Sequence, residues 1–267
     1  MADKEKPKNR YVAIIERIFE THYEKGATAV RFDRVEIEAV AKKLKVELPK
    51  NLGDLIYSFR YRTALPKSIS SKSKAGCEWV IESAGRSKYV FKQVRINRIV
   101  PRAELVTVKI PDSTPEIVIG YAQGDEQALL AKLRYNRLID VFLGLTSYSL
   151  QNHLRTTVAG VGQIEIDELY VGVDRNGTQY VIPVQAKGGK DQLSVVQTSQ
   201  DLACCKEKFP SLVCRAISAQ FMDDDRIALF ELTVEKDEVK VVEERHYKLV
   251  PMAEISESDL LTYRSRS

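Results

Sequence analysis

Residues 164–191 read IEIDELYVGVDRNGTQYVIPVQAKGGKD, and this stretch decides the fold expected for the chain. Apolar runs flank the Asn-Gly pair at 176–177, a dipeptide that strongly favours a hairpin with a tight turn. Asp167 falls on the first expected strand, and Gln185 and Lys187 fall on the second. Folding the hairpin about residue 176 places position 167 beside 185 or 186. We therefore expect an acid, an amide and an amine at one end of one sheet.

The second strand of this hairpin alternates its side chains between two faces of the sheet. Gln185 and Lys187 share one face, whereas Val184 and Ala186 share the other. A surface salt bridge on an exposed hairpin is the alternative interpretation. The segment IPVQAK is apolar enough for a buried strand, and a lysine buried there needs a partner or a task because an unpaired buried charge is costly. The pattern favours a functional site.

Length and composition narrow the class of protein. A chain of 267 residues can form one large domain or two modest ones. Its hydrophobic fraction of 44% and charged fraction of 29% are ordinary for a soluble protein, and no apolar run approaches the roughly 20 residues needed to cross a bilayer. The charged segment 1–9 is interpreted as a disordered lead without a secretory signal. Four cysteines without paired spacing indicate ordinary thiols in a reducing cytoplasm.

The net charge of +4 conceals an asymmetry between two parts of the chain. Residues 1–100 contain 22 Lys and Arg against 12 Asp and Glu, whereas the remainder contains 19 against 25. A basic part next to an acidic part suggests that one attracts phosphate and the other gathers carboxylates. An unspecialised solvated surface is the alternative.

The basic part has the pattern of a small helical domain with a hairpin. Amphipathic runs predict helices over 10–23, 34–46 with Asp33 as N-cap, and 51–66, and two short β-rich runs follow at 77–82 and 88–94. This order resembles a winged helix-turn-helix over residues 10–98, in which the third helix enters the major groove and the hairpin contacts the backbone. A protein-interaction module remains the alternative. The residues expected to contact DNA are Arg60, Tyr61, Arg62, Lys72, Lys74, Arg86 and Lys88.

The remainder of the chain predicts a mixed sheet flanked by helices, an α+β or α/β fold. Residues 99–120 are expected to form a strand-rich connector, and residues 121–267 a second domain. This domain begins with one long amphipathic helix, 125–145. Strands at 162–169 and 179–186, a helix at 192–209 and strands at 211–221 and 226–234 complete the order α-β-β-β-α-β-β.

The layout of residues 120–235 resembles the PD-(D/E)xK nuclease superfamily, the restriction-endonuclease-like fold, whose core is αβββαβ. The sequence Gln-Ala-Lys at 185–187, with glutamine in place of the usual acid, is similar to that of Mrr-type restriction endonucleases. Ile166 stands where the name of the superfamily has proline. The resemblance implies a central mixed sheet and phosphodiester hydrolysis that requires Mg²⁺.

The resemblance and the chemistry of the reaction together assign a role to each residue. Asp167 is expected to be the central Mg²⁺ ligand, Gln185 to offer its carbonyl oxygen, and Lys187 to stabilise charge on the phosphate and orient water. Because glutamine is neutral, the site lacks one negative charge. Glu126, in the first turn of the preceding helix, or Glu165, on the same face as Asp167, is expected to supply it.

Three other polar residues lie near this motif. Glu168 should point to the opposite face of the strand from Asp167 unless a bulge intervenes. For Gln197 and Gln200, on the helix that follows the motif, ordinary roles on the helix surface are the first interpretation, and contact with the site or the DNA backbone is the alternative.

The function expected from these features is that of a Mg²⁺-dependent DNA endonuclease from a bacterium, an archaeon or a phage. A type II or modification-dependent restriction enzyme is the first interpretation, with double-stranded DNA as substrate and 5′-phosphate and 3′-hydroxyl ends as products. A homodimer is expected because each chain supplies one active centre and duplex DNA has two strands. The alternatives are a repair or junction-resolving nuclease of the same fold and a catalytically silent DNA-binding regulator.

Overall fold

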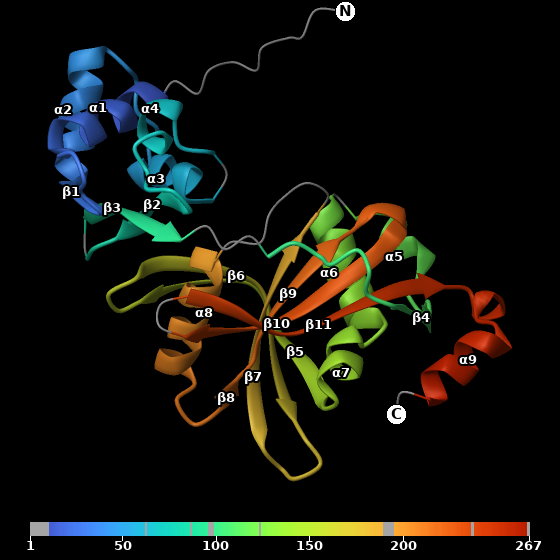
Figure 1. Ribbon diagram of the computed structural model, residues 1–267. Coiled ribbons are helices and arrows are strands. Elements are labelled where there is room, and N and C mark those ends of the chain that lie inside the picture. The colour runs from blue at the N-terminus through green and yellow to red at the C-terminus, as the bar shows by residue number, and fades with distance from the viewer. Residues whose placement is uncertain are drawn as a thin grey trace, which may run out of the picture. The chain divides into compact units, whose positions relative to one another are not determined.

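The computed structural model describes residues 11–61, 63–85, 87–95, 99–122, 124–188, 195–235 and 238–265. The chain forms two compact units, which are coloured by residue number in Figure 1. Unit 1 comprises Met1–Ile96 and Ala159–Gly162, and unit 2 comprises Asn97–Val158 and Gln163–Ser267. No helix in the described parts of the chain combines the length and the apolar character that a membrane crossing requires.

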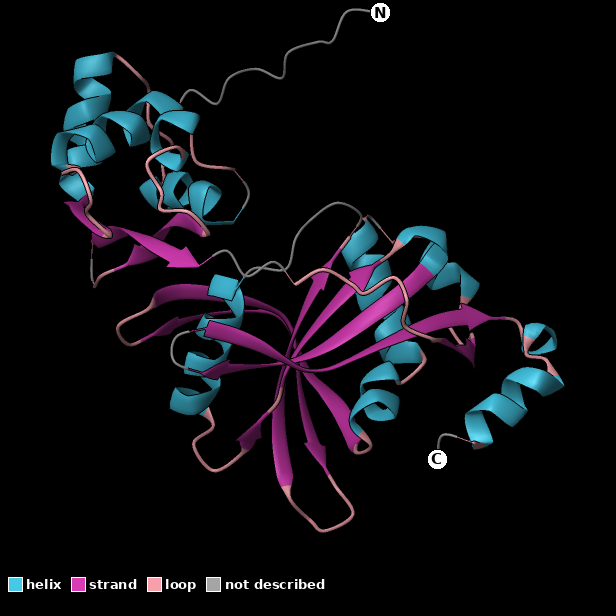
Figure 2. Ribbon diagram, in the orientation of Figure 1, coloured by secondary structure: helices cyan, strands magenta, loops and turns pink. Residues whose placement is uncertain are grey.

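Unit 1 contains the three helices and two strands expected from the sequence, together with a further short strand and a short helix. Its sheet has the order β1-β3-β2 and is antiparallel throughout. The helices cover this small sheet (Figure 2). The elements are α1 (Val12–His22), β1 (Ala29–Asp33), α2 (Arg34–Leu44), α3 (Leu52–Tyr61), α4 (Lys67–Ser70), β2 (Cys77–Ser83) and β3 (Lys88–Arg95).

The start of α2 confirms Asp33 as its N-cap. The Asp33 backbone N–H donates to Oε1 of Glu36 at 2.8 Å, which completes a capping box. At the other end Lys45 adopts a left-handed conformation with φ 54°, and its N–H returns to the Ala41 carbonyl. The third helix, α3, ends at Tyr61 and not at Pro66 as expected.

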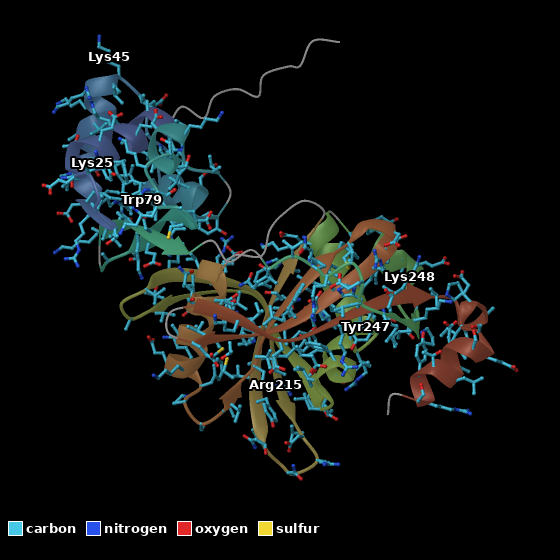
Figure 3. All side chains as sticks on the ribbon, viewed as in Figure 1. Lys25, Lys45, Trp79, Arg215, Tyr247 and Lys248 are labelled. Carbon is cyan, nitrogen blue, oxygen red and sulfur yellow. The ribbon has the colours of Figure 1, made fainter. Side chains whose placement is uncertain are left out.

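An aromatic cluster forms the centre of the unit 1 core. The Phe19 ring packs edge to face against Trp79 and Phe91, with centroids 5.0 and 5.1 Å apart. These residues come from α1, β2 and β3, so the cluster joins the helices to the sheet. Trp79 is labelled in Figure 3.

Unit 2 is built on a large mixed sheet with the strand order β4-β11-β10-β9-β7-β6-β5, and β8 also pairs with β7. Its elements are β4 (Thr107–Pro111), α5 (Glu116–Gly120), α6 (Asp125–Tyr135), α7 (Leu138–Leu143), β5 (Thr146–Val158), β6 (Gly162–Val173), β7 (Gln179–Lys187), α8 (Val195–Lys208), β8 (Val213–Cys214), β9 (Ala216–Phe221), η1 (Asp223–Asp225), β10 (Arg226–Glu235), β11 (Glu238–Val250), η2 (Met252–Glu254) and α9 (Glu257–Arg264).

Three parallel pairings among the described strands make this sheet mixed. Strands β7 and β9 run parallel, with α8 as the crossover between them, whereas β6 pairs with β7 and β9 with β10 in the antiparallel sense. Strand β8 adds to β7 and strand β4 to β11, both in parallel. The segment 99–120, expected as a strand-rich connector, thus contributes the strand β4 to the sheet of unit 2.

The single long helix expected over 125–145 is wrong, because the chain breaks into α6 and α7. Arg137 between them has a left-handed φ of 50°. The Asn136 side chain stabilises the break: its Oδ1 accepts from the Ser113 N–H at 2.7 Å, and its Nδ2 donates to the Lys132 carbonyl at 2.9 Å. Both helices pack on one face of the sheet, where Val184 and Ala186 are buried.

The hairpin of β6 and β7 has the turn that the sequence predicts. Its register runs from Val173↔Gln179 to Glu168↔Val184. Oδ1 of Asp174 accepts from the Asn176 and Thr178 N–H groups at 2.8 and 2.9 Å, and Gly177 takes a φ of 84°. The turn therefore aligns the two strands that carry the predicted site.

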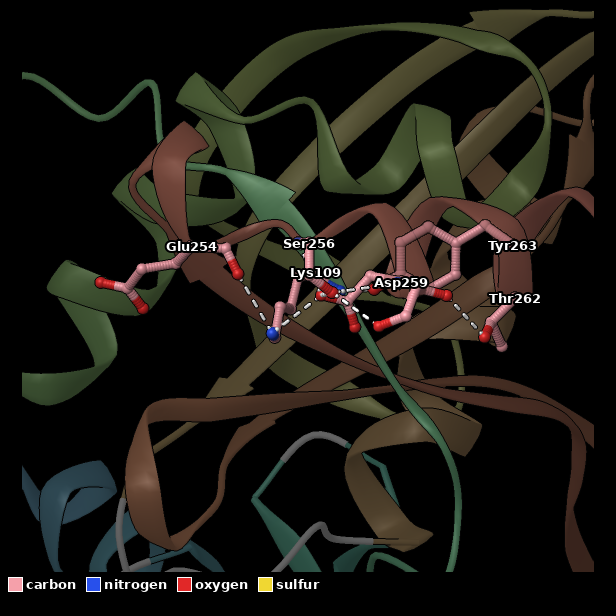
Figure 4. A network of polar contacts seen from close by, with 7 residues as sticks. Lys109, Glu254, Ser256, Asp259, Thr262 and Tyr263 are labelled. Carbon is pink, nitrogen blue, oxygen red and sulfur yellow. Dashed lines mark hydrogen bonds and ion pairs between the residues drawn. The ribbon is translucent and has the colours of Figure 1, made fainter.

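The last helix is held against the edge strand by a lysine. Lys109 on β4 places its Nζ 3.0 Å from Oδ2 of Asp259, and its backbone N–H donates to the Tyr263 hydroxyl at 2.9 Å (Figure 4). Ser256 caps α9 and accepts from the Asp259 N–H. Side chains on α9 thus anchor it to the edge of the sheet.

Candidate active site

The register between β6 and β7 ends at Glu168, and Asp167 is the next residue of β6 past that end. Its carboxylate Oδ2 accepts a hydrogen bond from the Ala186 backbone N–H at 2.9 Å. The side chain thus takes the place of a backbone partner where the register of the two strands ends. Asp167 is partly buried, and its second oxygen, Oδ1, is not used by this bond.

The electrostatic surroundings of Asp167 connect it to three of the other predicted residues. Burial raises the pKa of its carboxyl, and the charges of Glu126 and Glu165 raise it further. The Lys187 ammonium and the Ala186 N–H act in the opposite direction, and the net pKa lies above the ordinary value. Negative charge therefore accumulates around a partly buried carboxyl.

Lys187 and Glu126 meet at the edge of this group. The Lys187 Nζ lies 3.5 Å from Oε1 of Glu126, and the two side chains are 15% and 48% exposed. Lys187 is the last residue of β7, and Glu126 lies in the first turn of α6. The structure thus brings together an acid and an amine that are 61 positions apart in the chain.

Gln185 lies deeper than the other predicted residues and is only 3% exposed. Its Nε2 donates to Oδ2 of Asp201 at 2.8 Å and to the Glu165 carbonyl at 3.3 Å. Its Oε1 accepts from Nε2 of Gln197 at 3.4 Å. The oxygen expected to bind a metal is therefore in contact with the amide of a helix residue.

Asp201 on α8 is the residue that the sequence interpretation missed. It is 2% exposed, and burial raises the pKa of its carboxyl well above the ordinary value, with the charge of Asp167 acting in the same direction. Helical spacing offers a signal: Asp201 lies four residues after Gln197 and three and four before the buried Cys204 and Cys205. The signal that could have identified Asp201 is the presence of an acid on the buried stripe of a helix.

The surface role expected for Gln200 is wrong because this side chain is buried, whereas Gln197 takes the alternative role of touching the predicted site. Gln197 contacts the Gln185 amide, and Gln200 is 6% exposed. Both lie on turns of α8 that face the sheet, because the crossover from β7 to β9 lays this helix across the sheet.

The remaining acids of β6 have separate partners. Glu165 carries an ion pair with Arg155, whose Nε lies 3.3 Å from Oε2, and lies 3.9 Å from Nδ1 of His153. Glu168 points to the opposite face, as expected. It is fully buried there, with Oε1 2.9 Å from Nε of Arg134 and 2.6 Å from Oγ of Ser149.

The residues expected to contact DNA are placed differently from one another. Arg62 and Arg86 lie outside the described residues, as does the side chain of Tyr61. Arg60, expected to project from α3, instead has its Nε and one terminal nitrogen buried. Part of its guanidinium therefore lies inside unit 1 and does not project from the surface.

The lysines expected to contact DNA fall into two groups. Lys72 lies with its Nζ 5.4 and 5.0 Å from the ring centroids of Phe19 and Tyr23, a cation–π arrangement that covers the aromatic core. Lys74 and Lys88 are exposed. Among the described side chains of α3, only the acidic Asp54 is exposed. The exposed members of the expected DNA-contact set therefore lie on the loop and the hairpin and not on α3.

No family model, curated protein or solved structure matched the chain. Within the described ranges, no three His, Cys, Asp or Glu side chains converge closely enough to hold a metal ion by themselves. The chemistry of the site is therefore inferred from its own side chains.

Proposed function

We propose that the chain is a Mg²⁺-dependent DNA endonuclease with its active centre at Asp167, Gln185 and Lys187. The observation that carries the proposal is the grouping of Asp167 with Lys187 where the register of two paired strands ends, with Glu126 and Glu165 within electrostatic reach. Phosphodiester hydrolysis needs anionic and cationic groups side by side, since one holds a cation and the other stabilises the phosphate.

The acids present fit a magnesium ion by their chemistry. Asp167 and Glu126 offer hard carboxylate oxygens, and the concentrated negative charge around Asp167 would be relieved by a cation. Mg²⁺ usually keeps several waters and takes only one or two protein carboxylates together with substrate phosphate. Asp167 would hold it, with Glu126 as the second acid. When bound, the ion would neutralise charge on the phosphate and lower the pKa of a water molecule.

The protein side chains have distinct tasks in this proposal. Lys187 places a positive charge next to the phosphate, and its pairing with Glu126 restricts where the ammonium lies. Asp167 is held by the Ala186 N–H, so its orientation is fixed before substrate arrives. Gln185 offers a neutral oxygen beside them. Pre-organisation of this kind reduces the cost of arranging charges during the reaction.

DNA is proposed as the substrate because of unit 1. Its order of helix, strand, three helices and a hairpin supports a winged-helix-like role, and residues 1–100 have 22 basic against 12 acidic residues. The exposed Lys74 and Lys88 suggest phosphate contacts from the loop and hairpin. Restriction of foreign DNA, by a type II or modification-dependent enzyme acting as a homodimer, is the setting we propose.

Plasmid nicking tests the proposal directly. Supercoiled DNA, methylated and unmethylated, is incubated with the protein with and without Mg²⁺, beside Lys187→Ala. Lys208→Ala serves as the matched control, because Lys208 is an exposed lysine on α8 paired only locally with Glu207. We expect nicking that requires Mg²⁺ and is lost in Lys187→Ala alone.

The other outcomes separate the alternatives. DNA binding that is indifferent to Mg²⁺, with no nicking of any substrate, would identify a silent regulator and reject the nuclease. Preferential cutting of branched DNA over plain duplex would instead indicate a junction-resolving or repair nuclease of the same fold.

A further inference from the structure

The amide of Gln185 is held in one of its two possible orientations by groups around it. An amide can rotate by half a turn and exchange its oxygen and nitrogen, and only hydrogen-bond partners distinguish the two states. Here two acceptors, Oδ2 of Asp201 and the Glu165 carbonyl, lie beside the same end of the amide. With Nε2 at that end both contacts are hydrogen bonds, whereas an oxygen there would face the Glu165 backbone carbonyl, which can only accept.

Asp201 is the stronger of these two acceptors. Its contact of 2.8 Å is shorter than the 3.3 Å contact with the Glu165 carbonyl, and both Gln185 and Asp201 are almost fully buried. A buried donor that loses its acceptor carries a desolvation penalty, so the wrong orientation is disfavoured. The chain therefore uses a carboxyl from α8 to orient an amide on β7.

We propose that Asp201 is a positioning residue of the active centre. It holds Nε2 of Gln185 and so directs Oε1, the other end of the amide, away from the Asp201 carboxyl. This inference rests on the proposed nuclease function for its activity readout. Asp201 itself contacts the amide and is not assigned a place among the reacting groups. The role explains why a neutral glutamine is accompanied by a buried acid in the adjacent helix.

The partner of Oε1 shows how the orientation is used. The Gln197 amide lies 3.4 Å from Oε1, a long contact compared with the 2.8 Å bond at the other end. A weakly held acceptor can exchange one donor or cation for another at low cost. Asp201 therefore fixes one end of the Gln185 amide firmly while the other end stays exchangeable.

Two substitutions of Asp201 separate orientation from packing. Asp201→Asn retains an oxygen that accepts from Gln185, whereas Asp201→Leu has a similar size and no acceptor. Cys204→Ala is the matched control, because it removes a fully buried side chain from the same stripe of α8 without touching the amide. Asp201→Val replaces the leucine variant if the latter does not fold.

The first readout is the side-chain NH₂ signal of Gln185 in nitrogen-edited NMR, assigned by its absence in Gln185→Met. We expect slow hydrogen exchange of this group in the wild type, in Asp201→Asn and in Cys204→Ala. In Asp201→Leu we expect exchange to be at least about tenfold faster, since the buried bond is gone.

The second readout is the rate of Mg²⁺-dependent nicking and the Mg²⁺ concentration at half-maximal rate. Asp201→Leu should reduce the rate or the apparent Mg²⁺ affinity by about 10- to 100-fold, with Asp201→Asn within a few fold of wild type. Unchanged Gln185 exchange in Asp201→Leu, or equal losses in Cys204→Ala, would overturn the positioning role. A wild-type protein without nicking, whose Gln185 signal still depends on Asp201, would reject the nuclease and retain the positioning role.

Discussion

Asp167 and Glu168 are neighbours on β6, yet the two carboxylates lie in opposite environments. Glu168 is fully buried against α6, with an ion pair to Arg134 and a hydrogen bond from Ser149. Asp167, on the other face, is partly buried, and its pKa is raised by burial and by the nearby acids. Its carboxylate accepts a hydrogen bond from the Ala186 backbone N–H, and the Lys187 ammonium offsets only part of the rise in its pKa. Glu168 has a direct ion pair within the fold, whereas the charge of Asp167 is only partly compensated.

This difference indicates how a structural acid can be told from a candidate functional one. Oε1 of Glu168 has a guanidinium and a hydroxyl as partners and joins β6 to α6 and β5, although its Oε2 is buried with no hydrogen-bond partner among the described residues. A buried carboxylate beside other acids costs free energy, and such an arrangement is typical of sites that bind a cation or a substrate. Alternation along the strand predicted that these adjacent positions lie on opposite faces, and the structure adds their different partners.

The largest effect is expected from a substitution of Asp167. Asp167→Asn should reduce the nicking rate by roughly three orders of magnitude or more, because the charge that would hold the cation is lost. The melting temperature should stay the same or rise slightly, since a poorly compensated buried charge disappears. Single-turnover nicking and thermal unfolding measure the two effects. A variant that retains a tenth of the wild-type rate would contradict the assignment.

The matched substitution, of Glu168 on the opposite face, should lower stability and leave nicking nearly unchanged. Glu168→Gln removes the charge that pairs with Arg134, and we expect the free energy of unfolding to fall by about 1–2 kcal/mol. This is less than for a fully buried pair, because Arg134 is 37% exposed and glutamine can still accept its hydrogen bond. Urea unfolding measures the loss. Nicking per folded molecule should remain within a few fold of wild type, and a collapse like that of Asp167→Asn would show that the two acids act together.

A third prediction sharpens which acid assists Asp167. Glu126→Gln should raise the Mg²⁺ concentration for half-maximal nicking about tenfold, because Glu126 is half-exposed and its contact with Lys187 is a long one of 3.5 Å. Glu165→Gln should have a smaller effect, since Glu165 already pairs with Arg155. Nicking titrated with Mg²⁺ compares the two variants. The reverse ranking would assign the role to Glu165.

The smallest effect concerns Asp259, a partly buried acid outside the site. Hydrogen bonds from Ser256 and the contact with Lys109 lower the pKa of Asp259 to about 2 from its ordinary value of 3.8. Because the folded-state pKa is lowered, this stabilisation is present above about pH 4 and is lost as the pH falls toward 2. The stability difference between wild type and Asp259→Asn, measured by urea unfolding, should therefore shrink over this interval. A difference that is constant with pH would show that the contact is not electrostatic.

Much of the local structure was predictable from residues that act on their neighbours. The Asn-Gly pair at 176–177 indicated the hairpin, and Asp33 indicated the start of a helix, because turn and capping preferences depend on a few adjacent residues. The hairpin in turn indicated that Asp167 would lie beside Gln185 and Lys187, and the Asp167 bond to the Ala186 N–H agrees with this.

Features set by distant parts of the chain were not predictable in the same way. The break at Arg137 depends on Asn136 contacting Ser113, far from the helix in sequence. The role of Asp201 depends on how α8 lies across the sheet after the crossover. The burial of Arg60 likewise follows from tertiary packing that helical periodicity alone does not describe.

The bond between Asp167 and the Ala186 N–H has a further consequence for how this site can change. One oxygen of the carboxylate joins two strands where their register ends, and the other takes no part in this bond. Asparagine can keep the joint and lose the charge, whereas an apolar residue would lose both. The same side chain thus holds the strands together and carries the charge that the proposal needs, so the acid cannot be moved along β6 without changing its contact with the strand that carries Lys187.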